Sequence, residues 1–277
     1  NENFISIFSE IFYFKKIYRQ SDPKFKKILL NMRLGKITKQ SLDILNERII
    51  DEKELENLLQ IENITRLVPT KLKANKINKE KLDLLNEENY TYSRELLEEK
   101  ESLTKNQKNK LDTMTFNEKE TEYNYIKNST LTEEIIELKK NAFVMCIANL
   151  DIDNGIVNGS QGIIQGFDDN KNPIVKFKNK TVIIDKYSWK SETIPGITIK
   201  QIPLILAWSL TIHKAQGVTL EKVIIDVGND IFECGQMYVA FSRVKSLEGL
   251  YLENFDINKL KISSKVLNFY INNNLII

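Results

Sequence analysis

The chain has 277 residues, 42% of them hydrophobic, and its 40 basic and 38 acidic side chains leave a formal net charge of +2. This is the composition of an ordinary globular protein with a substantial core. The net charge excludes the class of nucleic-acid-binding proteins that have a large overall excess of basic residues. A local basic groove would still be enough to bind a phosphate backbone.

Cysteine usage and hydropathy exclude further classes. Two cysteines, Cys146 and Cys234, are too few for a disulfide framework or a zinc site, and they indicate a reducing intracellular compartment. No apolar run approaches the length of a membrane span and no signal peptide is visible, so we expect no membrane partner. The first residue is Asn1 instead of methionine, and we expect the chain to be part of a longer polypeptide.

The first elements are predicted from an aromatic run and two helix starts. Residues 11–20, IFYFKKIYRQ, are typical of a buried strand. Residues 21–23, Ser-Asp-Pro, predict a helix start with an N-cap residue and an early proline. Apolar residues at helical spacing continue that helix to Gly35, and residues 38–44 predict a second short helix.

A strand, a helix and a charged segment follow. Residues 64–70, ITRLVPT, predict a short strand, and residues 71–85 predict a helix directly after it. A strand that ends where a helix starts is the usual place for ligands in open α/β sheets. Residues 94–134 are crowded with Glu, Lys and Asn, and we interpret them as a solvated, partly helical or disordered insertion without a function.

The region from residue 143 to residue 206 is rich in strand signals. Its runs FVMCIANL, GSQGIIQGF, PIVKFKN and TVIIDKYSW are separated by turn residues, a pattern that favours a small barrel. Beyond it we expect a strand over 223–227, a helix in CGQMYVAFSRV and a last strand in LEGLYLEN. The predicted organisation is an α/β domain in two parts, 1–142 and 203–277, with a β module over 143–202.

Polar side chains gather around the one histidine of the chain. Thr211 and the stretch IHKAQG (212–217) supply hydroxyl, imidazole, ammonium and amide groups after an apolar run, and Gly217 allows a ligand to approach the backbone closely. Such donors suit the phosphates of single-stranded nucleic acid. For His213 alone, a structural role is the alternative. It cannot join a multi-histidine metal site, and a general base would need an oriented partner.

The joint pattern of five segments resembles superfamily 1 helicases of the Pif and RecD type. AWSLTIHKAQGVTLEKVIIDV (207–227) is similar to motif V and QMYVAFSRVKSLEGLYL (236–252) to motif VI. IYRQSDPKFKKILLNMRLG (17–35) resembles the motif IV region and ITRLVPTKLKANKIN (64–78) the segment after it. NLDIDNGIVNGSQGII (149–164) resembles the start of the small SH3-like insertion of Pif-type enzymes. Together these segments are specific, whereas any one of them is not.

The resemblance implies a fold and a function. The fold would be α/β, a RecA-like second domain of the P-loop NTPase type with an inserted small SH3-like β-barrel. The chain would be the C-terminal motor portion of an ATP-dependent DNA helicase that moves 5′ to 3′ on single-stranded DNA and unwinds duplexes. Its partners would be single-stranded DNA and DNA junctions, and its cofactors ATP and Mg²⁺. The compartment would be the cytoplasm in a bacterium, or the nucleus, mitochondrion or viral replication site otherwise.

The resemblance also implies roles for individual residues. Arg243 matches the arginine finger of motif VI and Arg19 the arginine of motif IV near the γ-phosphate; a planar, permanently charged guanidinium suits the negative charge that phosphoryl transfer builds. A surface ion pair is the alternative for each arginine. The nucleotide-binding residues would be Arg19, Gln216, Gly217 and Arg243, and the DNA-binding residues Thr70, Thr211, His213, Lys214 and Gln216.

A phosphate-cradling loop, G-x-x-x-x-G-K-[ST], is absent from the sequence. The nearest match, LGKIT (34–38), lacks the upstream glycine and has isoleucine after the lysine. The main groups that bind ATP and Mg²⁺ are therefore expected in a first RecA-like domain, upstream or on another chain, and these 277 residues alone are not expected to hydrolyse ATP. One alternative is a degenerate, non-catalytic module that binds single-stranded nucleic acid, although both motif arginines disfavour it. Another is a nuclease or recombinase subunit, which no acidic cluster supports.

Overall fold

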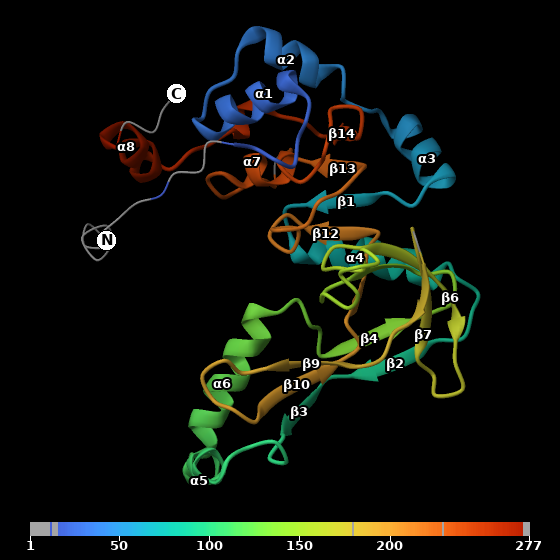
Figure 1. Cartoon of the computed structure of the whole chain (residues 1–277). Coiled ribbons are helices and arrows are strands. Elements are labelled where there is room, and N and C mark those ends of the chain that lie inside the picture. Colours follow the sequence, from blue (N-terminus) through green and yellow to red (C-terminus); the bar gives the residue numbers. More distant parts are fainter. Residues whose placement is uncertain (1–11, 13–15, 179, 229, 274–277) are drawn as a thin grey trace. The chain divides into compact units, whose positions relative to one another are not determined.

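The computed structural model describes residues 12, 16–178, 180–228 and 230–273. The chain divides into two compact units: unit 1 is Asn1–Glu52 with Thr219–Ile277, and unit 2 is Lys53–Val218. Figure 1 shows both units and labels many of their elements. Among the helices of the described residues, none has the length and apolar character that crossing a membrane requires.

Unit 1 is built on two parallel strands, β13 (Val223–Asp226) and β14 (Leu250–Glu253), with Val223 opposite Leu250. The chain between them forms α7 (Gln236–Phe241), against which α1 (Pro23–Arg33) packs. A helix between two parallel strands is the arrangement of an open α/β sheet. The remaining elements are α2 (Lys39–Asn46), the 3₁₀ helix η2 (Ile257–Lys259) and α8 (Ser264–Asn272).

The start of α1 is the one predicted. The carboxylate of its N-cap, Asp22, accepts a hydrogen bond from the backbone N–H of Lys24 at 2.8 Å, and Pro23 is the first helical residue. Gly35, just beyond the end of α1, has φ of +67°, which glycine adopts at little cost. The strand predicted over residues 11–20 is wrong for residues 12 and 16–20, which form none, and the rest of it lies outside the described residues.

Unit 2 contains a second parallel pair, β1 (Thr65–Val68) and β12 (Ser209–Thr211), with Val68 opposite Thr211. The helix α4 (Lys71–Asp83) begins three residues after β1 and packs against both strands. Both β1 and α4 agree with the sequence prediction. Before them, α3 (Glu52–Ile61) has no buried residue.

The five-stranded sheet of unit 2 has the linear order β11 (Leu204–Leu206), β5 (Phe143–Cys146), β6 (Gln161–Phe167), β7 (Pro173–Phe177), β8 (Thr181–Ile183). Each neighbouring pair is antiparallel, with a register shift between Ile164 and Gly166 in β6. Within the described ranges no pairing joins β8 to β11, so the predicted SH3-like barrel is not confirmed. The strands exist, but they form an open sheet.

A smaller layer of unit 2 pairs β3 (Glu95–Glu98) and β9 (Tyr187–Lys190) with β10 (Ile197–Gln201) between them. The helices α5 (Lys105–Thr113) and α6 (Phe116–Ser129) bury Leu111 and Ile126 against β10, and Trp189 packs against the same cluster. Residues 94–134 are therefore mostly solvated and partly helical, as predicted. The alternative of a disordered segment is wrong, because both helices share a core with β10. A two-stranded sheet joins β2 (Tyr90–Ser93) to β4 (Ile135–Leu138).

Candidate nucleotide and nucleic-acid sites

Arg19 and Gln20 are both attached to the backbone at the end of α7. Arg19 donates to the carbonyl of Ser242 at 2.8 Å and to the hydroxyl of Thr219 at 2.9 Å. Gln20 is buried, and its amide donates to the carbonyls of Ser242 (3.1 Å) and Val244 (2.8 Å). Arg19 and Gln20, which lie upstream of α1, are thus fixed to the loop that carries Arg243.

Arg243 lies in that loop, just beyond the end of α7. Its Nε donates to the carbonyl of Val239 at 2.9 Å, and one of its terminal nitrogens donates to the hydroxyl of Ser242 at 2.6 Å. Burial, and after it the positive charge of Arg19, lower the pKa of Arg243 to about 10. Both arginines are therefore held against the same residue, Ser242, with their like charges close enough to interact.

Two neighbouring guanidinium groups form a site for an anion. A partly buried cation beside another cation is destabilised, and a negatively charged ligand between them would remove that penalty. Planar guanidinium groups bind phosphate oxygens in pairs. Within the described part of the chain, Arg19 has neutral hydrogen-bond acceptors and no carboxylate partner. The side chains at this place therefore fit a phosphate.

Three residues around the arginines were not among the predicted site residues. Gln20, Thr219 and Ser242 position Arg19 and Arg243 through the contacts above. The only sequence signal was the adjacency of Gln20 to Arg19 and of Ser242 to Arg243. Neither adjacency indicates that the two segments meet.

The predicted DNA-binding residues occupy one edge of the β1–β12 pair in unit 2. Thr70 follows β1, and the stretch 212–217 forms a turn directly after β12. Because the strands are parallel and Val68 is opposite Thr211, both segments lie at the carboxyl ends of the strands. This is the edge at which open α/β sheets bind ligands.

Two threonines of this edge have structural bonds of their own. Thr211 is 8% exposed, and its Oγ1 accepts from the backbone N–H of Lys214 at 3.1 Å, which closes the turn. Thr70 is the N-cap of α4, and its Oγ1 accepts from the backbone N–H of Lys73 at 3.4 Å. Both hydroxyl groups keep their own proton for donation to a ligand.

Three residues of the turn are presented to solvent. His213, Gln216 and Gly217 are exposed, and Gly217 has φ of +84° with nothing within 4 Å of the place a Cβ would occupy. Lys214 is different, because its Nζ lies 2.7 Å from a carboxylate oxygen of Glu133. The structure thus brings Thr70, Thr211 and the turn together in unit 2, while Arg19 and Arg243 come together in unit 1.

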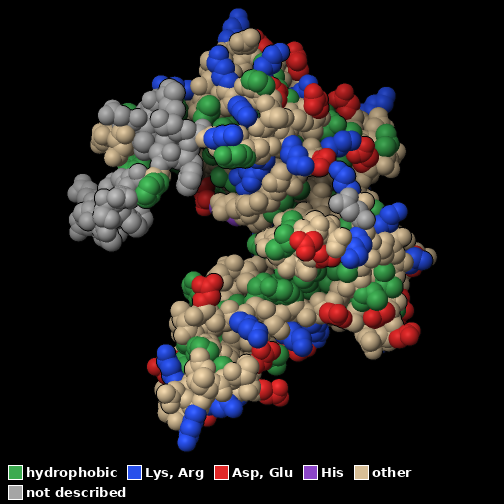
Figure 2. All heavy atoms as spheres, viewed as in Figure 1, with side chains coloured by type: hydrophobic (Ala, Val, Ile, Leu, Met, Phe, Trp, Pro, Cys, Tyr) green, Lys and Arg blue, Asp and Glu red, His purple; other side chains and the backbone are tan. Residues whose placement is uncertain are grey.

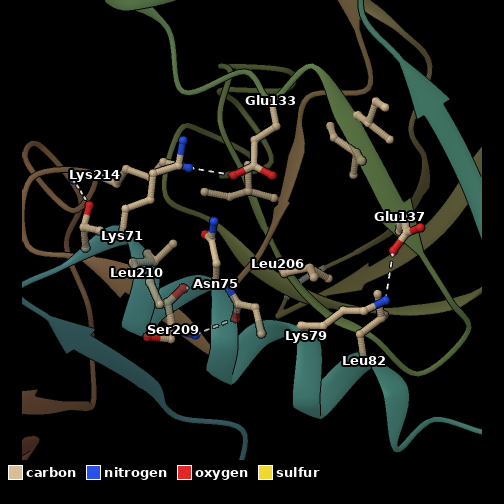
Figure 3. Close-up of a pocket in the computed structure, with 16 residues that line it drawn as sticks. Lys71, Asn75, Lys79, Leu82, Glu133, Glu137, Leu206, Ser209, Leu210 and Lys214 are labelled. Carbon is tan, nitrogen blue, oxygen red and sulfur yellow. Dashed lines mark hydrogen bonds and ion pairs between the residues drawn. The ribbon is translucent and has the colours of Figure 1, made fainter.

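A cavity of about 210 Å³ lies beside this edge. Lysine and asparagine side chains of α4 line one wall and Glu133 and Glu137 the other, as Figure 3 shows. On the face shown in Figure 2, acidic and basic side chains are interspersed over each of the two units. A phosphate backbone would therefore be bound by local groups such as Lys214.

The sequence matches two family models. One, described as the 2B domain of the DNA helicase Pif1, covers residues 123–167, from within α6 to the end of β6. The other, described as helicase, covers residues 197–276, which include the turn after β12 and α7.

Curated proteins and solved structures give the same relationship. The ATP-dependent DNA helicase Pif1 of Bdellovibrio bacteriovorus is 31% identical over 91% of this chain and 52% of that protein. Bacteroides sp Pif1 in complex with ADP-AlF4 has a TM-score of 0.71 at 26% identity, over 94% of this chain and 56% of that one. Bacteroides Pif1 in complex with ADP-AlF3 and ssDNA has a TM-score of 0.59 at 28% identity, over 93% and 55%. The chain spans 22% to 52% of the length of the curated relatives that it matches.

The α/β fold is that of a RecA-like helicase domain, as the solved structures with which it aligns over more than nine-tenths of its length indicate. Within that class, the matched 2B-domain model, the Bdellovibrio relative and the Bacteroides structures are all of Pif1. The chain is a Pif1-type member of superfamily 1B, and the resemblance drawn from the motifs is confirmed.

Proposed function

We propose that the chain is the part of a Pif1-type ATP-dependent DNA helicase that senses the nucleotide through Arg19 and Arg243 and binds single-stranded DNA through the turn after β12. Hydrolysis would drive 5′-to-3′ translocation and the unwinding of duplexes. The observation that carries the proposal is the convergence of the two arginines on Ser242.

The proposed role in nucleotide binding depends on the positive charges of Arg19 and Arg243. Phosphoryl transfer builds negative charge on the transferred group, and the protein takes little part in the covalent chemistry. Cations that are positioned beforehand therefore account for much of the catalysis. Arg243 is held by Val239 and Ser242 and Arg19 by Ser242 and Thr219. Neither guanidinium needs to be reorganised before it meets a phosphate. Gln216 and Gly217 are proposed as further nucleotide contacts.

The proposed DNA contacts all lie at the carboxyl ends of β1 and β12. Thr70 and Thr211 present hydroxyl groups there, and His213, Lys214 and Gln216 follow in the turn. These are donors that suit phosphate oxygens. One of the similar structures is a complex of Bacteroides Pif1 with ADP-AlF3 and ssDNA. This similarity supports single-stranded DNA as the ligand of the present chain. We propose that DNA junctions provide the single strand.

ATP and Mg²⁺ would be bound mainly by a P-loop that these 277 residues do not contain. We propose that a first RecA-like domain supplies it, on the same polypeptide or on another. ATP provides the phosphoryl group and Mg²⁺ neutralises its oxygens, while Arg19 and Arg243 orient and stabilise the charge from this side. The boundaries 1–142, 143–202 and 203–277, and an SH3-like character for the middle module, remain predictions.

The test is DNA-stimulated ATP hydrolysis by the intact protein, with Arg243→Ala and Arg243→Lys compared with wild type. Loss of an arginine finger reduces turnover by roughly a thousandfold or more. Lysine is not expected to restore it, because lysine keeps the charge but lacks the planar fork. Binding of single-stranded DNA should be retained in both variants.

Arg33→Lys is the matched control. Arg33 lies at the end of α1 in the same unit, where it bonds with the hydroxyl of Tyr270, and we expect hydrolysis by this variant to equal wild type. Undiminished hydrolysis by Arg243→Ala would contradict the proposal. A protein with normal DNA binding but no hydrolysis in the wild type would favour the non-catalytic module instead.

A further inference from the structure

Two ion pairs cross the cavity beside α4. Lys214 Nζ lies 2.7 Å from Glu133, and Lys79 Nζ lies 3.5 Å from Glu137. Figure 3 shows both pairs, with the lysines on the side of α4 and the turn and the glutamates opposite. Only the first pair involves a residue of the turn that follows β12.

The backbone at Glu133 is held in place by its neighbours. The buried side chain of Gln201 donates to the carbonyl of Glu133 at 3.3 Å. On either side, Arg94 donates from its guanidinium to the carbonyl of Thr132 at 3.4 Å and from its backbone N–H to the carbonyl of Glu134 at 2.8 Å. Three consecutive residues anchored through their backbone fix the point from which the side chain of Glu133 extends towards Lys214.

We propose that Glu133 is an internal competitor that occupies Lys214 when no nucleic acid is bound, and so sets the affinity of the turn for single-stranded DNA. The inference rests on the proposed function, because it assigns Lys214 to a DNA phosphate. Carboxylate and phosphate oxygens are the same kind of partner for an ammonium group. Within the described part of the chain, Glu133 is the one carboxylate bound to Lys214.

Competition follows from the charges. A phosphate that reaches the ammonium group of Lys214 comes close to the carboxylate of Glu133, and the two negative charges repel each other. Either the phosphate stays away or Glu133 separates from Lys214. Their side chains are 42% and 24% exposed, respectively, so water can replace each partner and the exchange is feasible. Glu133 is thus an affinity-determining residue that does not itself bind DNA.

The second pair supplies an internal control. Lys79 of α4 also lines the cavity and is shared between Glu137 and Asp83, the latter at 3.2 Å. Glu137→Gln removes the same charge from the same cavity and the same segment as Glu133→Gln. It leaves Lys214 and its partner untouched.

The experiment measures binding of a fluorescently labelled oligothymidine by anisotropy over a series of salt concentrations. The proteins are wild type, Glu133→Gln, Glu137→Gln, Lys214→Met and the double variant Glu133→Gln with Lys214→Met. We expect Glu133→Gln to bind about two- to fivefold more tightly, the range of an exposed ion pair. Its salt dependence should steepen by roughly 0.7 in the logarithmic slope, because one more lysine then neutralises a phosphate and releases a counterion from the DNA.

The other variants decide between explanations. We expect Glu137→Gln to bind like wild type, Lys214→Met to bind more weakly, and Glu133→Gln to have no effect once Lys214 is methionine. Equal gains from both glutamine variants would reflect general charge and would overturn the competitor role, as would a gain that persists without Lys214. If Lys214→Met weakens binding but Glu133→Gln changes nothing, the competitor role alone fails. If the wild type does not bind the oligonucleotide, the proposed function fails with it.

Discussion

Asn78 and Ser209 exchange two hydrogen bonds. The side-chain amide of Asn78 donates to the carbonyl of Ser209 at 2.8 Å, and its oxygen accepts from the backbone N–H of Ser209 at 2.8 Å. A side chain of α4 thereby binds the backbone of β12 as a neighbouring strand would. The strand that leads into the candidate DNA-binding turn is therefore fixed by the helix packed against it.

Asn78→Ala should destabilise unit 2 by about 1–3 kcal/mol, because it leaves a buried donor and a buried acceptor of Ser209 without partners. Urea unfolding measures the loss. Asn75→Ala is the matched control on the same helix, since Asn75 lines the same cavity but is exposed, and a change of within about 0.5 kcal/mol is expected there. Equal losses in both variants would contradict the special role of Asn78.

Gly217→Ala should destabilise the turn by about 1 kcal/mol through its backbone alone, because L residues avoid a left-handed φ. No atom lies within 4 Å of the added Cβ, so no clash contributes. Asparagine tolerates this conformation better than alanine, and Gly217→Asn should lose less. Gly166→Ala, also without a neighbour within 4 Å but without the positive φ, should be neutral or slightly stabilising. An equal loss at both glycines would refute the conformational explanation.

The start of α6 should respond to acid. Bonds from the backbone N–H and hydroxyl of Thr115 lower the pKa of Glu118 from 4.5. A carboxyl whose folded pKa is lowered stabilises the fold above its unfolded pKa, and this contribution is lost as pH falls below 4.5 through the folded pKa. Glu118→Gln keeps an acceptor for Thr115 but no charge, so its unfolding free energy should depend less on pH in that window. Denaturation series over acidic pH measure the difference, with Glu120→Gln, outside the capping box, as the control.

The two thiols should differ in reactivity. Cys146 is buried, its Sγ donates to the carbonyl of Ala148 at 3.1 Å, and burial raises its pKa. Cys234 is exposed. Because the thiolate is the reactive form, a disulfide reagent should modify Cys234 in the folded protein and Cys146 only on unfolding. Cys234→Ser should abolish the fast phase. A fast phase that remains in this variant would show that Cys146 is accessible.

Local signals predicted α1, α2, β13, α7 and β14 in unit 1 and the β1–α4 junction in unit 2. An N-cap followed by proline marked the start of α1, because a cap acts on residues only two or three positions away. The aromatic run before α1 misled the prediction. Residues 16–20 form no strand. Gln20 is buried and instead donates hydrogen bonds to Ser242 and Val244, which lie 222 and 224 positions further along the chain.

The charged segment could not be interpreted correctly from its own residues. In α5 and α6 the only buried side chains are Leu111 and Ile126, too few to produce a clear helical pattern. The partner that makes them a core, β10, lies about seventy residues further along the chain. The same limit applies to the site, where the motifs named Lys214 but its partner Glu133 is 81 positions away.

The two tryptophans of the chain, Trp189 and Trp208, both belong to unit 2. Trp208 is 7% exposed and its indole N–H donates to Asn63, whereas Trp189 is half-buried beside α5 and α6. Unit 1 therefore does not fluoresce when the chain is illuminated at a wavelength that excites only tryptophan. Emission from the chain follows unit 2 alone, while circular dichroism follows both units. A difference between the two signals during unfolding would distinguish loss of the arginine-bearing unit from loss of the unit that carries the turn.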